Sequence, residues 1–152
     1  MRKLAIAIDG PAGAGKSSVA KILAANMGYA YLDTGAMYRA VTYEVLRREL
    51  TEEKDIVALA AGMDMTVKPE ADAMHVVING HDVTDHIRTP EVSARVSAVS
   101  ALAGVRAAMV GIQRRQAAKG GIVLDGRDIG TTVLPHADVK ICLLYTSDAA
   151  DD

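Results

Sequence analysis

The chain has 152 residues, of which 50% are hydrophobic and 24% charged, a composition typical of one globular domain with its own core. Its formal net charge of −2 argues against a protein that coats nucleic acid or an anionic membrane. The single cysteine, Cys142, excludes an internal disulfide framework and any multi-cysteine metal site.

The first part of the chain alternates between strand and helix patterns. Leu4 to Ile8 is a continuous aliphatic run, typical of a strand buried on both faces of a parallel sheet, and it ends at Asp9-Gly10. This run is too short for a signal peptide or a membrane span, so we expect a cytoplasmic protein. From Ser17 the apolar spacing becomes helical, and Gly28 predicts the end of that helix. The residues with this spacing are Val19, Ile22, Leu23 and Met27.

One strand and two helices are expected next. Tyr29 to Asp33 predicts a second strand, and Ala36 to Leu50 predicts a helix. A further helix is expected to begin after Thr51, because its hydroxyl can cap the unpaired N–H groups of a first turn, and to end at Gly62.

The middle of the chain differs in kind. Asp64 to Lys68, Met74 to Ile78 and His81 to Thr84 are short stretches that alternate between apolar and polar residues. Asn79-Gly80 predicts a tight hairpin turn between the second and the third. We therefore expect a small antiparallel insert in an otherwise parallel α/β pattern.

The α/β pattern then resumes. Thr89-Pro90 predicts a helix start, with the hydroxyl as the cap and proline at the first helical position. Two helical segments are expected, 90–101 and 104–119, with a break near Gly104. Ile122 to Leu124 predicts a strand that ends at Asp125, and His136 to Leu144 contains the start of another.

A phosphate-binding motif lies between the first strand and the first helix. Residues 10–17 match GxxxxGK[ST], in which glycines turn backbone N–H groups toward a phosphate and the helix N-terminus adds partial positive charge. Lys16 is expected to reach the β and γ phosphates, and the Ser17 hydroxyl to bind Mg²⁺. The alternative is a glycine-rich turn that binds nothing. The expected ATP-binding residues are Gly10, Pro11, Ala12, Gly13, Ala14, Gly15, Lys16, Ser17 and Ser18.

Two further polar segments follow strands. Asp125 closes an apolar strand, the position of an acid that holds Mg²⁺ in P-loop proteins. Arg127 and Asp128 follow it in a tight turn, at the sheet edge where ligands bind in open α/β folds. A guanidinium fork suits a phosphate, and a carboxylate can accept from an amino group, so the pair suits a nucleoside monophosphate.

Three ordered motifs, DGPAGAGKSS, LDTGAMYR and LDGRDIGT, resemble the bacterial cytidylate kinases, which are P-loop nucleoside monophosphate kinases. The resemblance runs from about Leu4 to Lys140 and includes the INGHDVT and IRTPEVS stretches of the insert. It implies an α/β fold of the P-loop NTPase type, a three-layer parallel sheet with a small antiparallel insert, whose C-terminal part is missing here.

The resemblance also implies roles for individual residues. Lys16, Arg39 and Arg127 are the expected catalytic residues, and Ser17 with Asp125 the expected Mg²⁺ site. The residues expected to bind the acceptor nucleotide are Thr34, Arg39, Ser97, Arg106, Arg127 and Asp128. Without the resemblance, Ser97 and Arg106 are typical helix-surface residues.

The implied reaction is ATP-dependent phosphorylation of CMP, with dCMP as a second acceptor, by a monomer that binds neither nucleic acid nor membrane. Three alternatives stay open: another P-loop small-molecule kinase acting on UMP, AMP or shikimate, a GTPase, and a nucleotide-binding module without catalysis. A GTPase is disfavoured because no NKxD-type motif is present.

Two other clusters are interpreted as structural. His81 to His86 holds four potential metal ligands, but on a strand the two histidines would face opposite ways, so no metal site is expected there. Arg114-Arg115 near a helix end is expected to be a solvated pair that complements the helix dipole.

The expected domain organisation is an incomplete kinase domain over residues 1–141, with a core at about 1–40 and 119–141 and the insert and helices at about 41–118. Cys142 to Asp152 resembles a translated sequencing adapter, so we expect a non-native tail. No arginine follows Arg127, whereas the family closes an arginine-bearing lid, so we expect this chain to be a poor kinase.

Overall fold

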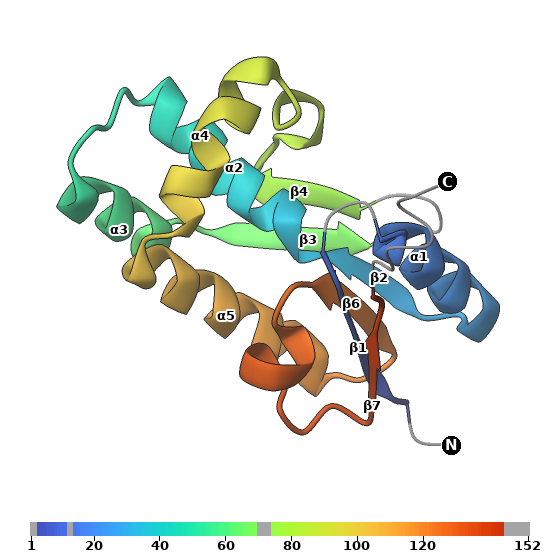
Figure 1. The fold of residues 1–152 in the computed structure, drawn as a ribbon. Coiled ribbons are helices and arrows are strands. Elements are labelled where there is room, and N and C mark those ends of the chain that lie inside the picture. Colours follow the sequence, from blue (N-terminus) through green and yellow to red (C-terminus); the bar gives the residue numbers. More distant parts are fainter. Residues whose placement is uncertain (1–2, 12–13, 70–73, 145–152) are drawn as a thin grey trace, which may run out of the picture. The chain divides into compact units, whose positions relative to one another are not determined.

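The structure is a computed structural model that describes residues 3–11, 14–69 and 74–144 (Figure 1). Ala12 and Gly13 of the expected phosphate loop and most of the expected tail lie outside the described residues. The elements in chain order are β1 (Ala5–Asp9), α1 (Lys16–Met27), β2 (Ala30–Asp33), α2 (Thr34–Arg47), α3 (Glu53–Gly62), β3 (Met65–Pro69), β4 (Met74–Ile78), β5 (His81–Asp82), the 3₁₀ turn η1 (Thr84–His86), α4 (Pro90–Ser100), α5 (Ala103–Ala118), β6 (Ile122–Gly126), the π-helical turn η2 (Ile129–Val133) and β7 (Val139–Cys142).

The chain forms two compact units. Within the described residues, the sheet unit comprises 3–11, 14–34, 69 and 114–144, and the insert unit comprises 35–68 and 74–113. Helices α2 and α5 contribute residues to both.

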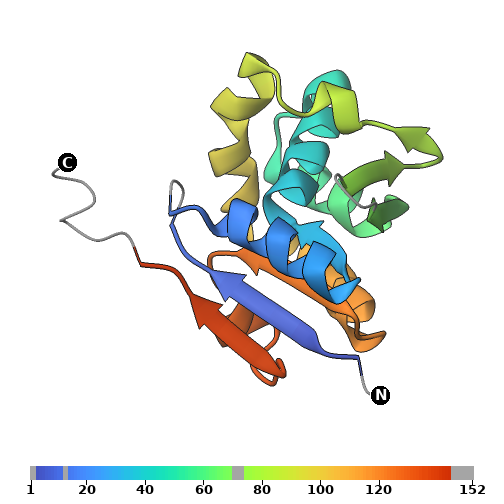
Figure 2. The same cartoon turned by 90° about the vertical axis from the view of Figure 1, so that its right-hand side faces the viewer.

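The sheet unit contains a four-stranded sheet in the order β2-β6-β1-β7. Every pairing is parallel, and β1 lies between β6 and β7, with Ile6 opposite both Val123 and Val139 (Figure 2). Strands 100 residues apart in sequence thus become neighbours, which places the carboxyl ends of β1, β2 and β6 at one edge. The expected parallel α/β fold is confirmed.

Helix α1 packs on this sheet through its small residues. Ala20 and Ala24 are buried with Ile6, Ile8 and Val123 in one cluster. The expected helix is confirmed, but three of the four apolar residues that predicted it are exposed: Ile22 is 63% exposed, and Val19 and Met27 are each 39% exposed. Alanine lets a helix approach a sheet closely, so the face with the least side-chain volume is the one that is buried. The expected end at Gly28 is confirmed, since this residue caps the helix with φ 67°.

The insert unit contains the second sheet, in the order β3-β4-β5. Strands β4 and β5 are antiparallel, and they are joined at Asn79 and Gly80, which have φ values of 50° and 85°. Two successive positive φ values are the mark of the tight hairpin turn predicted for Asn-Gly.

The start of α4 agrees with the sequence prediction, whereas the cap of α3 differs from it. The Thr89 hydroxyl accepts a hydrogen bond from Val92 N and Pro90 begins α4, as predicted. Thr51 does not cap α3: the cap position is Glu52, which makes no side-chain cap bond. The two helices expected at 90–101 and 104–119 are confirmed as α4 (Pro90–Ser100) and α5 (Ala103–Ala118), with the break near Gly104 as predicted.

Gly104 allows close packing of α5 on α3. A β-carbon built on it would overlap Val57 Cγ1. Among the described helices, none alone is long and apolar enough to cross a membrane; α4 and α5 meet the criterion only as a pair bent by 97°.

Candidate functional site

The described part of the phosphate loop has the geometry of an anion site. Gly15 adopts φ 81° and occupies the cap position of α1, so the helix begins at Lys16 without a side-chain cap. Val19 N donates to Gly15 O, and the helix has no acidic residue in its first turn. The N–H groups of Lys16, Ser17 and Ser18 therefore have no helical acceptor before them, and the positive end of the helix dipole is not offset by an adjacent acid.

Asp125, at the end of β6, is a buried carboxylate beside this loop. Its Oδ2 accepts a 2.7 Å hydrogen bond from the Tyr31 hydroxyl, and Asp33 lies opposite it in the β2–β6 register. Burial raises the pKa of Asp125 to about 6, and the negative charge of Asp33 adds to the rise. The Tyr31 hydrogen bond and then the Lys16 charge oppose it. Oxygen donors and a nearby lysine are the groups that a Mg²⁺–phosphate complex requires.

The backbone at the end of β6 is held by the first residue of α2. Thr34 donates its hydroxyl hydrogen to Asp125 O at 2.8 Å, and the side chain is buried. A β-carbon at Gly126 would lie 2.7 Å from the same hydroxyl oxygen, so this close approach requires glycine. The Thr34 hydroxyl is thus already committed as a donor, and only its lone pairs remain for the role expected near the substrate.

Asp9 also holds this backbone, and sequence reasoning did not single it out. Its Oδ1 accepts from Ile129 N at 2.6 Å and its Oδ2 from Gly130 N at 2.7 Å. No local signal could have revealed the pairing, because the partners lie about 120 positions away. The strand-end position of Asp9, immediately before the motif, was the only available hint.

Arg127 and Asp128 lie in the segment between these anchors. Arg127 is exposed and Asp128 is half-buried. The Asp128 carbonyl accepts from Thr132 N and Val133 N, which starts the turn η2. The structure thus brings Thr34, Asp125, Arg127 and Asp128 to the carboxyl edge of the sheet, as the sequence predicted.

Arg114 corrects an expectation. Its Nε donates to Val133 O at 2.8 Å and its Nη2 to Thr132 O at 3.0 Å. It is therefore not half of a solvated pair but the anchor for the carbonyl end of η2. Carbonyl groups at the C-terminal end of a helix attract a cationic donor. Arg114 lies on α5, but the carbonyl groups that it binds are those at the end of η2.

In the insert unit, Arg39 bridges α2 to α4. Its Nη1 donates to Ser93 Oγ at 2.9 Å and to Ile87 O at 3.3 Å. Ser97 is exposed one helical turn after Ser93, and Arg106 is exposed on α5. Ser93 was not among the predicted residues; its position one turn before Ser97 was the available signal.

His75 and His86 of the insert unit have structural partners. His75 Nδ1 lies 2.8 Å from Asp82 Oδ2, and the ring of His86 stacks on Tyr43 with centroids 5.5 Å apart. Hydrogen bonds from the hydroxyl and then the N–H of Thr84 lower the pKa of Asp82 to about 2. Over the described ranges, no three His, Cys, Asp or Glu side chains converge as metal ligands.

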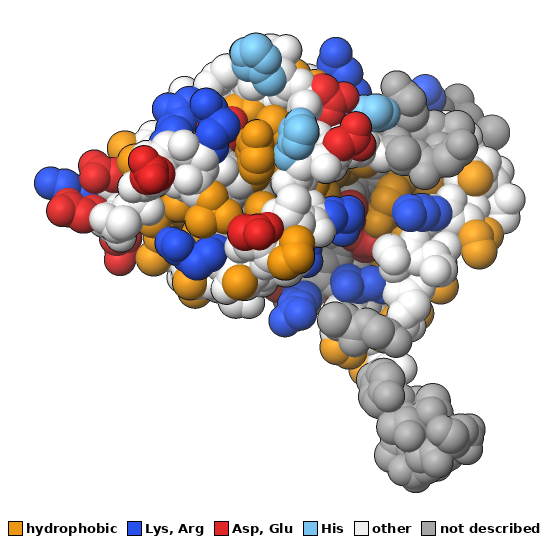
Figure 3. All heavy atoms as spheres, turned by 90° about the horizontal axis from the view of Figure 1, so that it is seen from above, with side chains coloured by type: hydrophobic (Ala, Val, Ile, Leu, Met, Phe, Trp, Pro, Cys, Tyr) orange, Lys and Arg blue, Asp and Glu red, His pale blue; other side chains and the backbone are white. Residues whose placement is uncertain are grey.

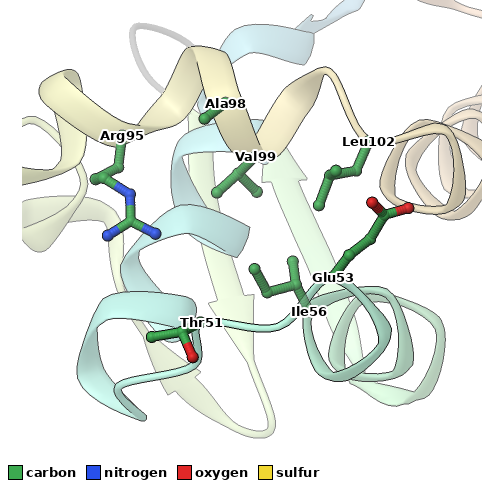
Figure 4. Close-up of a pocket in the computed structure, with 7 residues that line it drawn as sticks. All are labelled: Thr51, Glu53, Ile56, Arg95, Ala98, Val99 and Leu102. Carbon is green, nitrogen blue, oxygen red and sulfur yellow. The ribbon is translucent and has the colours of Figure 1, made fainter.

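Neither of two cavities coincides with the predicted site. One of about 190 Å³ in the insert unit is lined by α3 and α4 and the residues beside them (Figure 4). Its lining residues are Thr51, Glu53, Ile56, Arg95, Ala98, Val99 and Leu102. Another of about 390 Å³ lies in the sheet unit near Arg114 and His136. Both cationic and anionic side chains lie on the face shown in Figure 3.

Comparison with known proteins assigns the chain to a family. The family model described as cytidylate kinase matches residues 6–149. The chain belongs to the cytidylate kinase family. The cytidylate kinase of Desulfitobacterium hafniense (strain Y51) is 51% identical over 149 residues, which are 97% of this chain and 64% of that protein.

Two Bacillus relatives agree. The cytidylate kinase of Bacillus licheniformis (strain ATCC 14580) is 54% identical over 147 residues, 94% of this chain and 65% of that protein. That of Bacillus subtilis (strain 168) is 52% identical over 145 residues, 94% of this chain and 65% of that protein. This cytidylate kinase family member thus spans 64% to 65% of the length of these relatives. The matched range extends past residue 141, the expected boundary of the kinase sequence.

Proposed function

We propose that this protein transfers the γ-phosphoryl group of ATP to CMP or dCMP, forming ADP and CDP or dCDP. The observation that carries the proposal is the family match over residues 6–149, with relatives named cytidylate kinase at 51% to 54% identity. We further propose that it acts as a cytoplasmic monomer.

ATP is proposed to bind at the N-terminus of α1. Gly15 in its left-handed conformation and the N–H groups of the first turn supply the cradle, and Lys16 supplies the charge for the β and γ phosphates. The absence of acidic residues from the first turn of α1 favours an anion at this end.

Ser17 and Asp125 would hold Mg²⁺. A hydroxyl and one or two carboxylates suffice for this ion when phosphate oxygens and waters complete its shell. Asp125 has a pKa of about 6, so it is mostly ionised at neutral pH. Its carboxylate could then accept a hydrogen bond from a water molecule bound to the ion. When bound, the ion would neutralise charge on the phosphates and orient them for transfer.

Each unit has its own proposed acceptor contacts. In the sheet unit these are Thr34, Arg127 and Asp128, of which Asp128 would face the cytosine amino group. In the insert unit they are Arg39, Ser97 and Arg106. The Ser93 bond fixes the Arg39 guanidinium against α4, so this cation is oriented before any phosphate arrives.

Catalysis by these residues consists of positioning and charge neutralisation. Phosphoryl transfer needs little covalent help from a protein, because charge spreads over the equatorial oxygens of the transferred group. Lys16, Arg39 and Arg127 are proposed to stabilise that charge.

The test is ADP formation with CMP, dCMP, UMP, AMP and shikimate as acceptors. We expect activity with CMP and dCMP above the others, and a loss of about 10²- to 10³-fold in Lys16→Ala. Lys54→Ala is the matched control, because Lys54 forms an exposed ion pair with Glu52 at 3.6 Å. Phosphorylation of AMP or shikimate in preference to CMP would overturn the proposed substrate, and nucleotide binding without turnover would favour a binding module.

A further inference from the structure

Asp9 joins the phosphate loop to the loop that carries two proposed acceptor contacts. It ends β1, and the next residue is Gly10, the first of the motif. Its two carboxylate oxygens accept from consecutive N–H groups, those of Ile129 and Gly130. A carboxylate is the side chain suited to this pair of donors, because both of its oxygens accept and neither donates.

A second bond closes the other end of the same segment. Gly10 N donates to Gly126 O at 3.2 Å. Residues 127 and 128 therefore lie between two connections to the end of β1, one through Gly126 and one through Asp9. Neighbouring Asp9 and Gly10 thus fix both ends of the segment.

The contact with Asp9 leaves little room for a side chain at Gly130. A β-carbon there would lie 3.1 Å from Asp9 Oδ2 and 3.3 Å from the Lys140 side chain. That is tighter than ordinary van der Waals contact, so a side chain at residue 130 would push the loop off the carboxylate. The position of the loop depends on Asp9 and on the space left by Gly130.

We propose that Asp9 is a positioning residue that holds Arg127 and Asp128 in register with the phosphate loop, so that acceptor and donor phosphates are received by one connected backbone. This inference rests on the proposed function. Asp9 itself contacts neither nucleotide: it acts through the backbone of residues 126–130.

The test uses Asp9→Asn in the full chain. This isosteric change replaces one acceptor oxygen by an NH₂ donor, which then faces a backbone N–H. Calorimetric titration with CMP and, separately, ADP gives both dissociation constants, and a reversibly unfolded fraction would weaken both apparent affinities by the same factor. We expect CMP affinity to fall by about tenfold, as for loss of one charge-assisted hydrogen bond, and ADP affinity to change by less than about threefold.

Asp138→Asn is the matched control. Asp138 Oδ2 accepts from Ala5 N at 2.9 Å, so the same change is made at the opposite end of β1. We expect both affinities to stay within about twofold of the parent, since this bond is remote from residues 127 and 128. Equal losses of CMP and ADP affinity in Asp9→Asn, or an unchanged CMP affinity, would overturn the proposal.

A parent chain that binds ADP but not CMP would refute the proposed acceptor. In that case amide hydrogen exchange tests the positioning role of Asp9 independently of CMP binding. Asp9→Asn should accelerate exchange at Ile129 and Gly130 by at least about tenfold, without acceleration in the interior of β6. Unchanged exchange, or acceleration of equal size throughout the sheet, would overturn the positioning role.

Discussion

The Tyr31 hydroxyl donates a 2.7 Å hydrogen bond to Oδ2 of Asp125, and both residues are almost completely buried. The bond joins β2 to β6 at the edge where the proposed Mg²⁺ site lies. It stabilises a carboxylate that is otherwise costly to bury. The bond offsets only part of the cost of burying this charge, so at neutral pH ionised Asp125 lowers the free energy of unfolding of the protein without ligands.

The first prediction follows from the pKa of Asp125, which is about 6 in the folded chain against an ordinary value of 3.8. The folded state binds the Asp125 proton more tightly than the unfolded state does. Binding of this proton therefore stabilises the fold fully below pH about 4, and the stabilisation is lost as the pH rises through about 6. Asp125→Asn should therefore raise the free energy of unfolding at pH 7.5, without nucleotide or Mg²⁺, by about 2 kcal/mol.

Urea denaturation at several pH values checks this. The gain from Asp125→Asn should shrink as the pH falls toward 4, whereas exposed Asp64→Asn should give little difference at any pH. The same Asp125 variant should lose Mg²⁺-dependent turnover. A gain that is the same at pH 4 and pH 7.5 would contradict the assigned cause.

The second prediction concerns the contact between α3 and α5. Gly104→Ala places a methyl group where Val57 already lies, and we expect a loss of about 1 to 3 kcal/mol in the free energy of unfolding. Gly62→Ala is the control: nothing lies within 4 Å of its β-carbon position, so that variant should be neutral or slightly more stable. The double variant Gly104→Ala, Val57→Ala should recover part of the loss, and no loss in Gly104→Ala would contradict the contact.

The elements predicted from sequence are those whose signals are local. The strand before Asp9, the glycine at the end of α1, the Asn79-Gly80 turn and the Thr89-Pro90 start each follow from backbone preferences of neighbouring residues. The phosphate loop belongs to the same class, because its motif prescribes a strand, a turn and a helix in order.

What sequence reasoning missed depends on partners distant in the chain. The buried face of α1 was chosen by how closely a helix can approach the sheet, not by which of its residues are most hydrophobic. The packing role of Gly104 was missed because Val57, which a β-carbon at this position would meet, is 47 positions away. Asp9 and Arg114 are ordinary charged residues until the fold supplies N–H or C=O groups for them to bind.

The third prediction tests Arg114. Arg114→Met keeps most of the side-chain volume but removes the donors to Thr132 O and Val133 O, and we expect a loss of about 1 kcal/mol in unfolding free energy. Arg115→Met is the control, since no hydrogen bond or ion pair of this side chain is found among the described residues. Equal effects of the two substitutions in urea denaturation would show that Arg114 is only a solvated charge.

The fourth prediction separates backbone strain from phosphate binding. Gly15 and Gly28 flank α1 with φ values of 81° and 67°, and nothing lies within 4 Å of either β-carbon position. Alanine in this left-handed region costs about 1 to 2 kcal/mol, so Gly15→Ala and Gly28→Ala should lose similar stability. Only Gly15→Ala alters the cradle at the N-terminus of α1, so it alone should weaken ADP binding, by about tenfold or more. Calorimetric titration measures this, and equal ADP affinities in the two variants would exclude the N-terminus of α1 as the phosphate site.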